Sequence, residues 1–207
     1  MHTNVKKFLQ AAAVFPVLTA SLLTAPFPGI VPGSPLAAAI SPDQTRNLIS
    51  DTVVNQHRAM IDEAAAKIDA YYAHHDLHME GMGSKLAQAA ADNDLPVTAL
   101  AAMAMIESTG MDPKTCAQRT NNPFGYGSCK IKFDSVDEAI TTVAETLAAK
   151  RPGTARFYAN KTFAQKLRVY NGYNADDQYI PKVKWVMEQI EKTPLPENLA
   201  SAAQVKA

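Results

Sequence analysis

The sequence has no excess of charge of either sign. Twenty Lys and Arg residues balance twenty Asp and Glu residues in a chain of 207, so no overall field attracts nucleic acid. The nine glycines are scattered, and neither a Walker-type nor a dinucleotide-binding glycine pattern is present. Fixed-period repeats are absent too. These absences argue against the common nucleotide-binding and repeat classes, while 47% hydrophobic residues suffice for one globular core.

The N-terminal apolar run is too short for a typical membrane-spanning helix. Lys6 and Lys7 precede about fifteen mostly apolar residues, which Pro16 interrupts. A Pro-rich stretch and an A-x-A pattern ending at Ala39 follow, as in a secretory signal. We expect residues 1–39 to be a cleaved signal peptide or an uncleaved N-terminal anchor with a Pro-rich stalk. The protein would then be secreted or associated with the cell envelope.

Cysteine is rare as well. The only two, Cys116 and Cys129, enclose a short segment. In an oxidising compartment such a pair favours a disulfide, which would stabilise the fold by roughly 3 kcal/mol in the chain-entropy model. Two reduced thiols are the alternative, and the spacing is wrong for a two-cysteine zinc knuckle.

Helical periodicity covers most of the remaining chain, and no extended strand pattern competes with it. The predicted class is mostly α, with a helical lead-in over residues 40–66, one helical domain over 67–192 and a mobile tail over 193–207. Residues 111–134 are rich in Asn, Pro and Gly, which indicates tight turns, and "KIKF" at 130–133 suggests a short strand. We expect a turn or short helix over 151–161. The expected helices are residues 41–75, 82–94, 94–109, 135–150, 162–172 and 179–192.

Polar residues mark several helix starts. Asp94 is expected to cap the third helix, Thr162 a later one, and Ser135 with Glu138 forms a capping-box pattern. The first helix carries an apolar face that packs on the domain or, alternatively, belongs to a longer arm that holds the domain off a membrane or pairs with a second copy. That face consists of Ile49, Val53, Met60, Ala64, Ile68 and Tyr71.

Glu107 is the one ionisable side chain between Leu95 and Met111. It ends an apolar helix that Gly110 and Pro113 terminate. Apolar neighbours and the negative end of the helix dipole both raise the pKa of a carboxyl in this position. A glutamate that holds its proton near neutral pH can act as a general acid. The alternative is a glutamate that meets solvent in the last turn of its helix.

Four segments occur in an order that resembles a known enzyme family. They are "AMAMIESTG", "NNPFGYGSC", "FDSVDEAITTVAETL" and "YNGYNADDQYIPKVKWVMEQI". The resemblance, over about residues 68–190, is to the bacterial peptidoglycan glucosaminidases named after mannosyl-glycoprotein endo-β-N-acetylglucosaminidase (glycoside hydrolase family 73). It implies a lysozyme-like, mostly helical fold and cleavage of the cell-wall glycan after N-acetylglucosamine.

The resemblance also implies roles for particular residues. Glu107 would be the general acid, Asn122, Phe124 and Gly125 would shape the floor of the cleft, and Asn121 belongs to the same motif. Tyr126 and Tyr179 would contact sugar. Independently of the resemblance, Tyr158, Tyr170 and Tyr173 are tyrosines that could stack on a sugar or hydrogen-bond to it.

The chain departs from the family in its short segment 111–134. Many members carry a larger lobe there with a second acid, whereas Asp112 and Asp134 are the only candidates here. Glycosidases usually use two carboxylates, but assistance by the substrate's own N-acetyl group is a known exception. The alternatives are a lytic transglycosylase with the same glutamate and a non-catalytic peptidoglycan-binding module.

Metals and cofactors are not expected. His74 and His78 lie four residues apart, but histidines near a helix C-terminus interact favourably with its dipole, and neither a third ligand nor an H-E-x-x-H pattern is apparent. We expect peptidoglycan glycan strands as the partner, no nucleic acid, and a monomer that associates with membranes only through its N-terminal segment.

Overall fold

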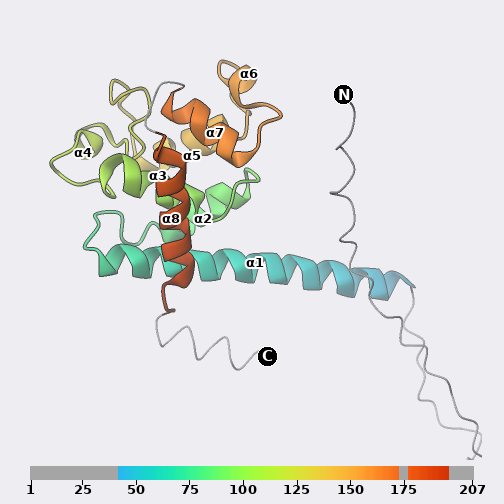
Figure 1. The fold of residues 1–207 in the computed structure, drawn as a ribbon. Helices are drawn as coiled ribbons and strands as arrows, with labels where there is room; N and C mark the ends of the chain where they lie inside the picture. Colours follow the sequence, from blue (N-terminus) through green and yellow to red (C-terminus); the bar gives the residue numbers. More distant parts are fainter. Residues whose placement is uncertain (1–41, 173–176, 196–207) are drawn as a thin grey trace, which may run out of the picture. The chain divides into compact units, whose positions relative to one another are not determined.

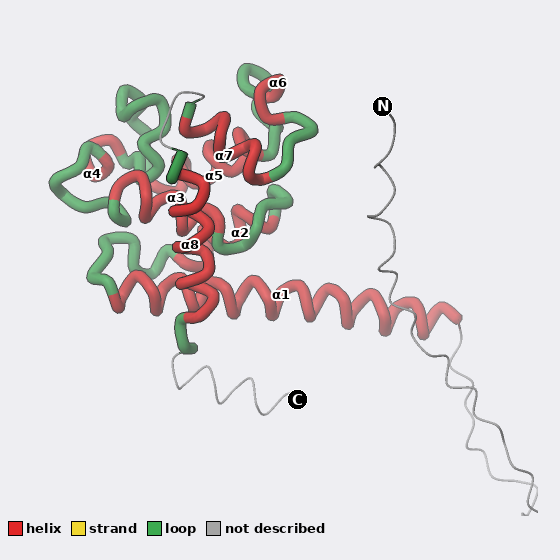
Figure 2. Tube along the Cα trace, in the orientation of Figure 1, coloured by secondary structure: helices red, strands yellow, loops and turns green. Residues whose placement is uncertain are grey.

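The computed structural model describes residues 42–172 and 177–195 as a set of helices joined by turns, with no strand in these two ranges. The chain divides into the units Met1–Ser41 and Pro42–Ala207, and every described residue belongs to the second. The proposed signal or anchor, Tyr173 and residues 196–207 lie outside the described residues. Figures 1 and 2 show the helices, which are α1 Pro42–His74, α2 Gly83–Ala91, α3 Ala99–Ser108, α4 Ala117–Thr120, α5 Val136–Leu147, α6 Ala155–Tyr158, α7 Phe163–Asn171 and α8 Tyr179–Lys192. The predicted mostly α class is confirmed.

Among the residues of helix α1 whose burial is described, 51–74, the buried ones begin at Ile61, and the side chain of Ile49 lies outside the described set. Residues 51–60 are exposed, including Val53 and Met60 of the expected apolar face, whereas Ala64, Ile68 and Tyr71 of the same face are buried. The part of α1 from Ile61 onward packs against α2, and α8 crosses it (Figure 1). Among the described helices, none is both long and apolar enough to span a membrane.

Helix α3 forms the centre of the core. Its residues 99–104 are buried, and Leu100 and Met103 have no exposed surface. Four of these six residues are alanines, whose small side chains allow α2 and α8 to pack closely on it. The Tyr72 hydroxyl of α1 donates to the Ala101 carbonyl at 2.9 Å. Helix α3, which is apolar on all sides, is therefore packed against α2 and α8 and hydrogen-bonded to α1. Its C-terminal end is a rigid support for Glu107.

The start of α3 differs from the prediction. It begins at Ala99 rather than after Asp94, and Asp94 adopts a left-handed conformation with φ of 51°. The Asp94 N–H donates to the Ala91 carbonyl, so this residue closes α2 and does not cap α3. The expectation at Thr162 is confirmed, since Thr162 and Gln165 form a full capping box on α7. On α5, Ser135 caps Glu138 N–H, but the Glu138 carboxylate accepts from Asp134 N–H.

Residues 111–134, here called the lobe, contain a one-turn helix, α4, that the sequence did not predict. The expected strand at 130–133 is wrong, because this segment lacks the ladder of hydrogen bonds that a strand requires. Phe133 N–H donates to the Thr120 carbonyl at 2.9 Å, and Asn121 Nδ2 donates to the Phe133 carbonyl at 3.0 Å. The predicted disulfide joins Cys116 and Cys129, whose Cα atoms lie 6.2 Å apart.

Candidate active site

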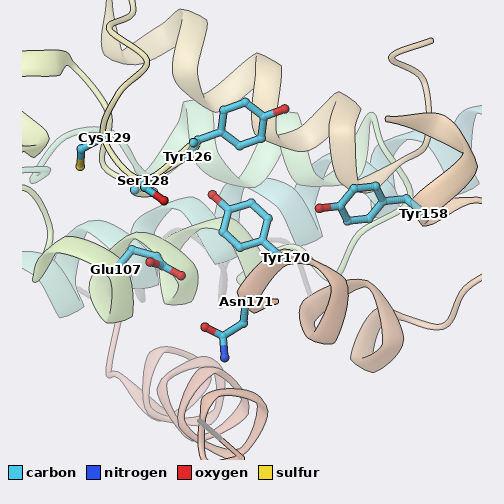
Figure 3. A pocket seen from close by; sticks show the side chains of 9 residues that line it. Glu107, Tyr126, Ser128, Cys129, Tyr158, Tyr170 and Asn171 are labelled. Atoms are coloured by element: carbon cyan, nitrogen blue, oxygen red, sulfur yellow. The ribbon is translucent and has the colours of Figure 1, made fainter. Parts of the chain in front are cut away.

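A cavity of about 510 Å³ opens at the C-terminal end of α3. Helix α3 contributes Glu107, the lobe contributes residues 125–129, and α6 and α7 contribute side chains from the opposite wall. Figure 3 shows Glu107 on one side and the tyrosines of the lobe, α6 and α7 on the other. The lining residues are Glu107, Gly125, Tyr126, Gly127, Ser128, Cys129, Tyr158, Tyr170 and Asn171.

Glu107 is only partly exposed, and burial raises the pKa of its carboxyl above the ordinary value of 4.5. An interaction with the Tyr179 hydroxyl opposes this shift and lowers the same pKa. Burial is the larger effect because the charged form loses solvation in an apolar setting. The geometry therefore provides a carboxyl that keeps its proton to a higher pH than a solvent-exposed glutamate.

Tyr179 stands at the first residue of α8 and is buried. Burial and the negative charge of Glu107 both raise the pKa of its hydroxyl far above 10. The hydroxyl lies close enough to Glu107 to lower the pKa of that carboxyl. It does not, however, meet the distance and angle criteria for a hydrogen bond with any partner in the described part of the chain. The pair is thus an incomplete hydrogen bond that favours the charged form of the acid.

Gly125 brings the lobe backbone against Glu107. Its φ of 58° lies in the left-handed region, and a Cβ at this position would meet Glu107 Oε2 at 3.2 Å. The turn around Gly125 is shaped by Asn122, which is buried. Asn122 Oδ1 accepts from Tyr126 N–H at 2.9 Å, and its Nδ2 donates to the Tyr126 carbonyl at 2.8 Å. Glycine is favoured here because the backbone conformation and the close carboxylate both disfavour a side chain.

Ser108 joins the end of α3 to the lobe. Its hydroxyl lies 2.8 Å from the Pro123 carbonyl and 3.1 Å from the Ala104 carbonyl, between which its single proton is shared. The same oxygen accepts from Met111 N–H at 3.0 Å. A buried hydroxyl that both donates and accepts hydrogen bonds in this way is a rigid connection. Ser108 therefore fixes the position of the turn that faces the neighbouring Glu107.

Three tyrosines form the wall opposite Glu107. The Tyr170 hydroxyl donates to the Phe124 carbonyl at 2.8 Å, and the rings of Tyr126 and Tyr170 have centroids 6.3 Å apart. Burial raises the pKa of Tyr170, and the charge of Glu107 adds to this shift. In Figure 3 the hydroxyl of Tyr158 points toward Tyr170. Aromatic faces and hydroxyls beside one carboxyl form a surface that can stack on a sugar ring and hydrogen-bond to it.

Residues 83–192 match the family model described as "Glucosaminidase: Mannosyl-glycoprotein endo-beta-N-acetylglucosaminidase". The chain belongs to this family. The match confirms the resemblance expected from the four sequence motifs. It makes the protein a glycoside hydrolase of the peptidoglycan endo-β-N-acetylglucosaminidase type, with peptidoglycan as its substrate. Neither a curated protein nor a solved structure matches the chain.

The residues expected to bind sugar in this glucosaminidase divide into two groups. Gly125, Tyr126, Tyr158 and Tyr170 line the cavity with Glu107. The others do not line it: Asn122 and Phe124 are buried in the turn, Asn121 donates to the Phe133 and Asp134 carbonyls, and Tyr179 lies against Glu107.

The two candidate second acids of the glucosaminidase also lie away from the cavity lining. Asp112 Oδ1 accepts from the backbone N–H of Lys114 at 2.8 Å, as in a turn, and Asp134 is exposed, two residues before α5 begins. Within the described ranges, Glu107 is the one carboxylate among the lining residues. The same ranges contain no group of three His, Cys, Asp or Glu side chains that could hold a metal ion.

Sequence reasoning missed four lining residues of the glucosaminidase cavity. Ser128 and Asn171 add hydrogen-bonding groups, while Gly127 and Cys129 complete the wall that the lobe forms. Each one lies near a residue that was recognised, since Asn171 directly follows Tyr170 and the other three lie within three residues of Tyr126. Proximity to a tyrosine was the available signal, in the turn-rich lobe for three of them and at the end of α7 for Asn171.

Proposed function

We propose that this protein is an exported glucosaminidase that cuts peptidoglycan strands with Glu107 as general acid. The observation that carries the proposal is the position of Glu107. It is a partly buried carboxyl with a raised pKa, at the rigid end of α3, in a cavity lined by three tyrosines.

In the first step, the protonated Glu107 carboxyl donates its proton to the oxygen of the scissile glycosidic bond. The C1–O bond breaks, and the leaving sugar departs as an alcohol. A positioned general acid of this kind contributes about 10²–10⁴-fold to a rate. The raised pKa keeps the acid protonated where an exposed glutamate would be ionised.

In the same step, the carbonyl oxygen of the substrate's own N-acetyl group attacks C1 and forms a cyclic intermediate. Water then opens this ring, and the Glu107 carboxylate accepts the proton of that water. Substrate assistance is favoured because the described lining supplies one carboxylate, whereas two are usual in glycosidases. Tyr126, Tyr158 and Tyr170 hold the sugar rings in this scheme.

The same single carboxylate favours a second candidate, a lytic transglycosylase. There, the 6-hydroxyl of the muramic acid attacks its own C1, and Glu107 accepts the hydroxyl proton after protonating the leaving oxygen. The product is a 1,6-anhydromuramoyl end, formed without uptake of water. Hydrolysis by a glucosaminidase instead leaves a reducing N-acetylglucosamine end.

The test is digestion of purified peptidoglycan followed by mass analysis of the released ends. Wild-type protein should release reducing N-acetylglucosamine, and Glu107→Gln should lower the rate by at least about 100-fold. Glu191→Gln, an exposed change on α8, is the matched control and should keep full activity. Anhydromuramoyl ends would identify the transglycosylase. Saturable binding of the wild type without any new ends, or full activity of Glu107→Gln, would refute the assignment.

Export belongs to the same proposal. The substrate lies outside the cytoplasmic membrane, and the basic, apolar and A-x-A pattern of residues 1–39 supports secretion or attachment to the cell envelope. Sequencing the N-terminus of protein recovered from the culture medium and from the envelope fraction would distinguish cleavage after Ala39 from an intact anchor.

A further inference from the structure

The lobe carries a concentration of positive charge in a chain whose formal net charge is zero. Residues 111–134 contain four basic side chains against two acids. All four basic residues are exposed, and they are Lys114, Arg119, Lys130 and Lys132.

Two connections bring these charges together. The disulfide joins Cys116, which lies between Lys114 and Arg119, to Cys129, which directly precedes Lys130. The hydrogen bond from Phe133 N–H to the Thr120 carbonyl places the neighbours of these two residues, Lys132 and Arg119, on adjoining segments. Like charges gathered in this way repel one another, so the arrangement does not arise from a need for stability.

The fold does not neutralise these charges. None of the four takes part in an ion pair within the described ranges, where the recorded pairs involve Lys67, Lys85, Arg151 and Lys192. Three nearby acids have other partners: Asp112 accepts from a backbone N–H, Asp137 is ion-paired with Lys85, and Glu138 accepts from Asp134 N–H. The remaining acid of the lobe, Asp134, is exposed and forms no ion pair with the four cations within the same ranges. The four cations therefore remain available to an anionic partner.

The charged lobe forms one wall of the cavity. Residues 125–129 line it, and Lys130 belongs to the same turn because its N–H donates to the Gly127 carbonyl at 3.1 Å. Figure 3 shows Ser128 and Cys129 on this wall. A substrate strand in the cavity would thus have its pendant groups beside Lys130, and the other three basic residues lie on the lobe segments joined to this turn by the disulfide and by the Phe133–Thr120 hydrogen bond.

The geometry points to a substrate-recognition surface made of Lys114, Arg119, Lys130 and Lys132, which binds the carboxylates of the peptides carried by peptidoglycan strands. This inference rests on the proposed function. The muramic acid residues on either side of a bond cut after N-acetylglucosamine carry short peptides, whose side-chain and terminal carboxylates are ionised at neutral pH. Lys and Arg attract such groups and accelerate encounter with the cleft.

The test compares two soluble substrates, glycan strands that carry their peptides and the same strands after amidase removal of the peptides. The lobe variant combines K114Q, R119Q, K130Q and K132Q. The matched control removes the same number and types of charge outside the lobe, with K161Q, K166Q, R168Q and K184Q. Circular dichroism and thermal melting verify folding, and the double variant K130Q/K132Q serves if the fourfold variant fails to fold.

We expect the lobe variant to lose at least about tenfold in kcat/KM on peptide-bearing strands at low salt, with kcat nearly unchanged. High salt should reduce the difference, since it screens exposed charges. On peptide-free strands the lobe variant should equal the wild type, and the control variant should equal it on both substrates.

Equal losses on both substrates, or no loss on either, would overturn the inference. If the wild type cuts neither substrate, the proposed function fails, and co-sedimentation with insoluble, peptide-bearing cell walls then decides the inference separately. Salt-sensitive binding that the lobe variant loses would support it, and unchanged binding would refute it.

Discussion

Gly125 lies so close to Glu107 that a methyl group on it would sit 3.2 Å from the Oε2 atom of that carboxyl. The absent side chain leaves the acid in its position, and the left-handed φ of 58° makes glycine the favoured residue. The close contact between the lobe backbone and Glu107 therefore requires glycine at position 125.

Gly125→Ala should therefore lower kcat by about tenfold or more, because a small displacement of a catalytic group carries a large rate penalty. Gly81→Ala is the control, since Gly81 also has a positive φ, of 83°, but a Cβ there has nothing within 4 Å. Both variants should lose about 1 kcal/mol of stability from the strained backbone. Steady-state kinetics and urea unfolding test this, and full activity of Gly125→Ala would contradict the close contact.

Tyr179→Phe should move the alkaline limb of the pH–activity profile to higher pH. The acid must be protonated to donate, so activity falls as pH rises through the pKa of Glu107. The Tyr179 hydroxyl lowers that pKa, and its removal lets burial raise the pKa further. Tyr71→Phe, a change at another buried tyrosine on α1, should leave the profile in place. A shift of the limb to lower pH after Tyr179→Phe would contradict the prediction.

Glu107→Gln should gain stability relative to the wild type as pH rises. The pKa of Glu107 is higher in the folded protein than its ordinary value of 4.5. Its contribution to stability is fully present below the unfolded pKa and is lost as pH rises through the folded pKa. Glutamine has no such loss because it does not ionise. Urea unfolding at acidic and at neutral pH measures the difference, and one that does not change with pH would show that burial does not affect this carboxyl.

Ser108→Ala should destabilise the fold by about 1–3 kcal/mol, because it leaves the Pro123 carbonyl and the Met111 N–H without their buried partner. It should also lower activity, since the turn that carries Gly125 loses its connection to α3. Ser84→Ala, an exposed change in α2, provides the comparison. If chemical denaturation shows the two variants to be equally stable, Ser108 does not hold the lobe.

Reduction of the Cys116–Cys129 disulfide should lower stability by about 3 kcal/mol in the chain-entropy model. Activity should fall as well, because Cys129 lines the cavity and the loop it closes contains Gly125. Denaturation and activity are measured with and without reductant. The double variant C116S/C129S should resemble the reduced protein, and reductant should not change its stability or activity. If reductant does not change the stability or activity of the wild type either, the prediction is wrong.

The core of the fold could be predicted from sequence because its signals are local. An alanine- and methionine-rich run with one acid identified α3 and Glu107, and Thr162 with Gln165 marked the start of α7. Asp94 was wrong as a cap because a good capping residue can also close the preceding helix. The strand at 130–133 was wrong because a strand requires a partner, and the short lobe does not provide one.

The arrangement of the site was less accessible to sequence reasoning. Tyr158 and Tyr170 come from helices more than fifty residues beyond Glu107, and helical periodicity does not show which faces meet. The ability of tyrosine to stack on a sugar and to hydrogen-bond to it brought both residues into consideration. The connection from Ser108 to Pro123 depends on a backbone turn, so only the structure could show it.

Both ends of the lobe are fixed independently of its tip. Ser108 holds the segment near Met111 and Pro123, and Thr120 with Asn121 holds Phe133. The tip between Gly127 and Lys130 is largely exposed, and doubling the length of a flexible loop costs only about 0.6 kcal/mol. Segments of other lengths could therefore be inserted between Ser128 and Cys129, with the disulfide kept, to change which wall polymers the cleft accepts.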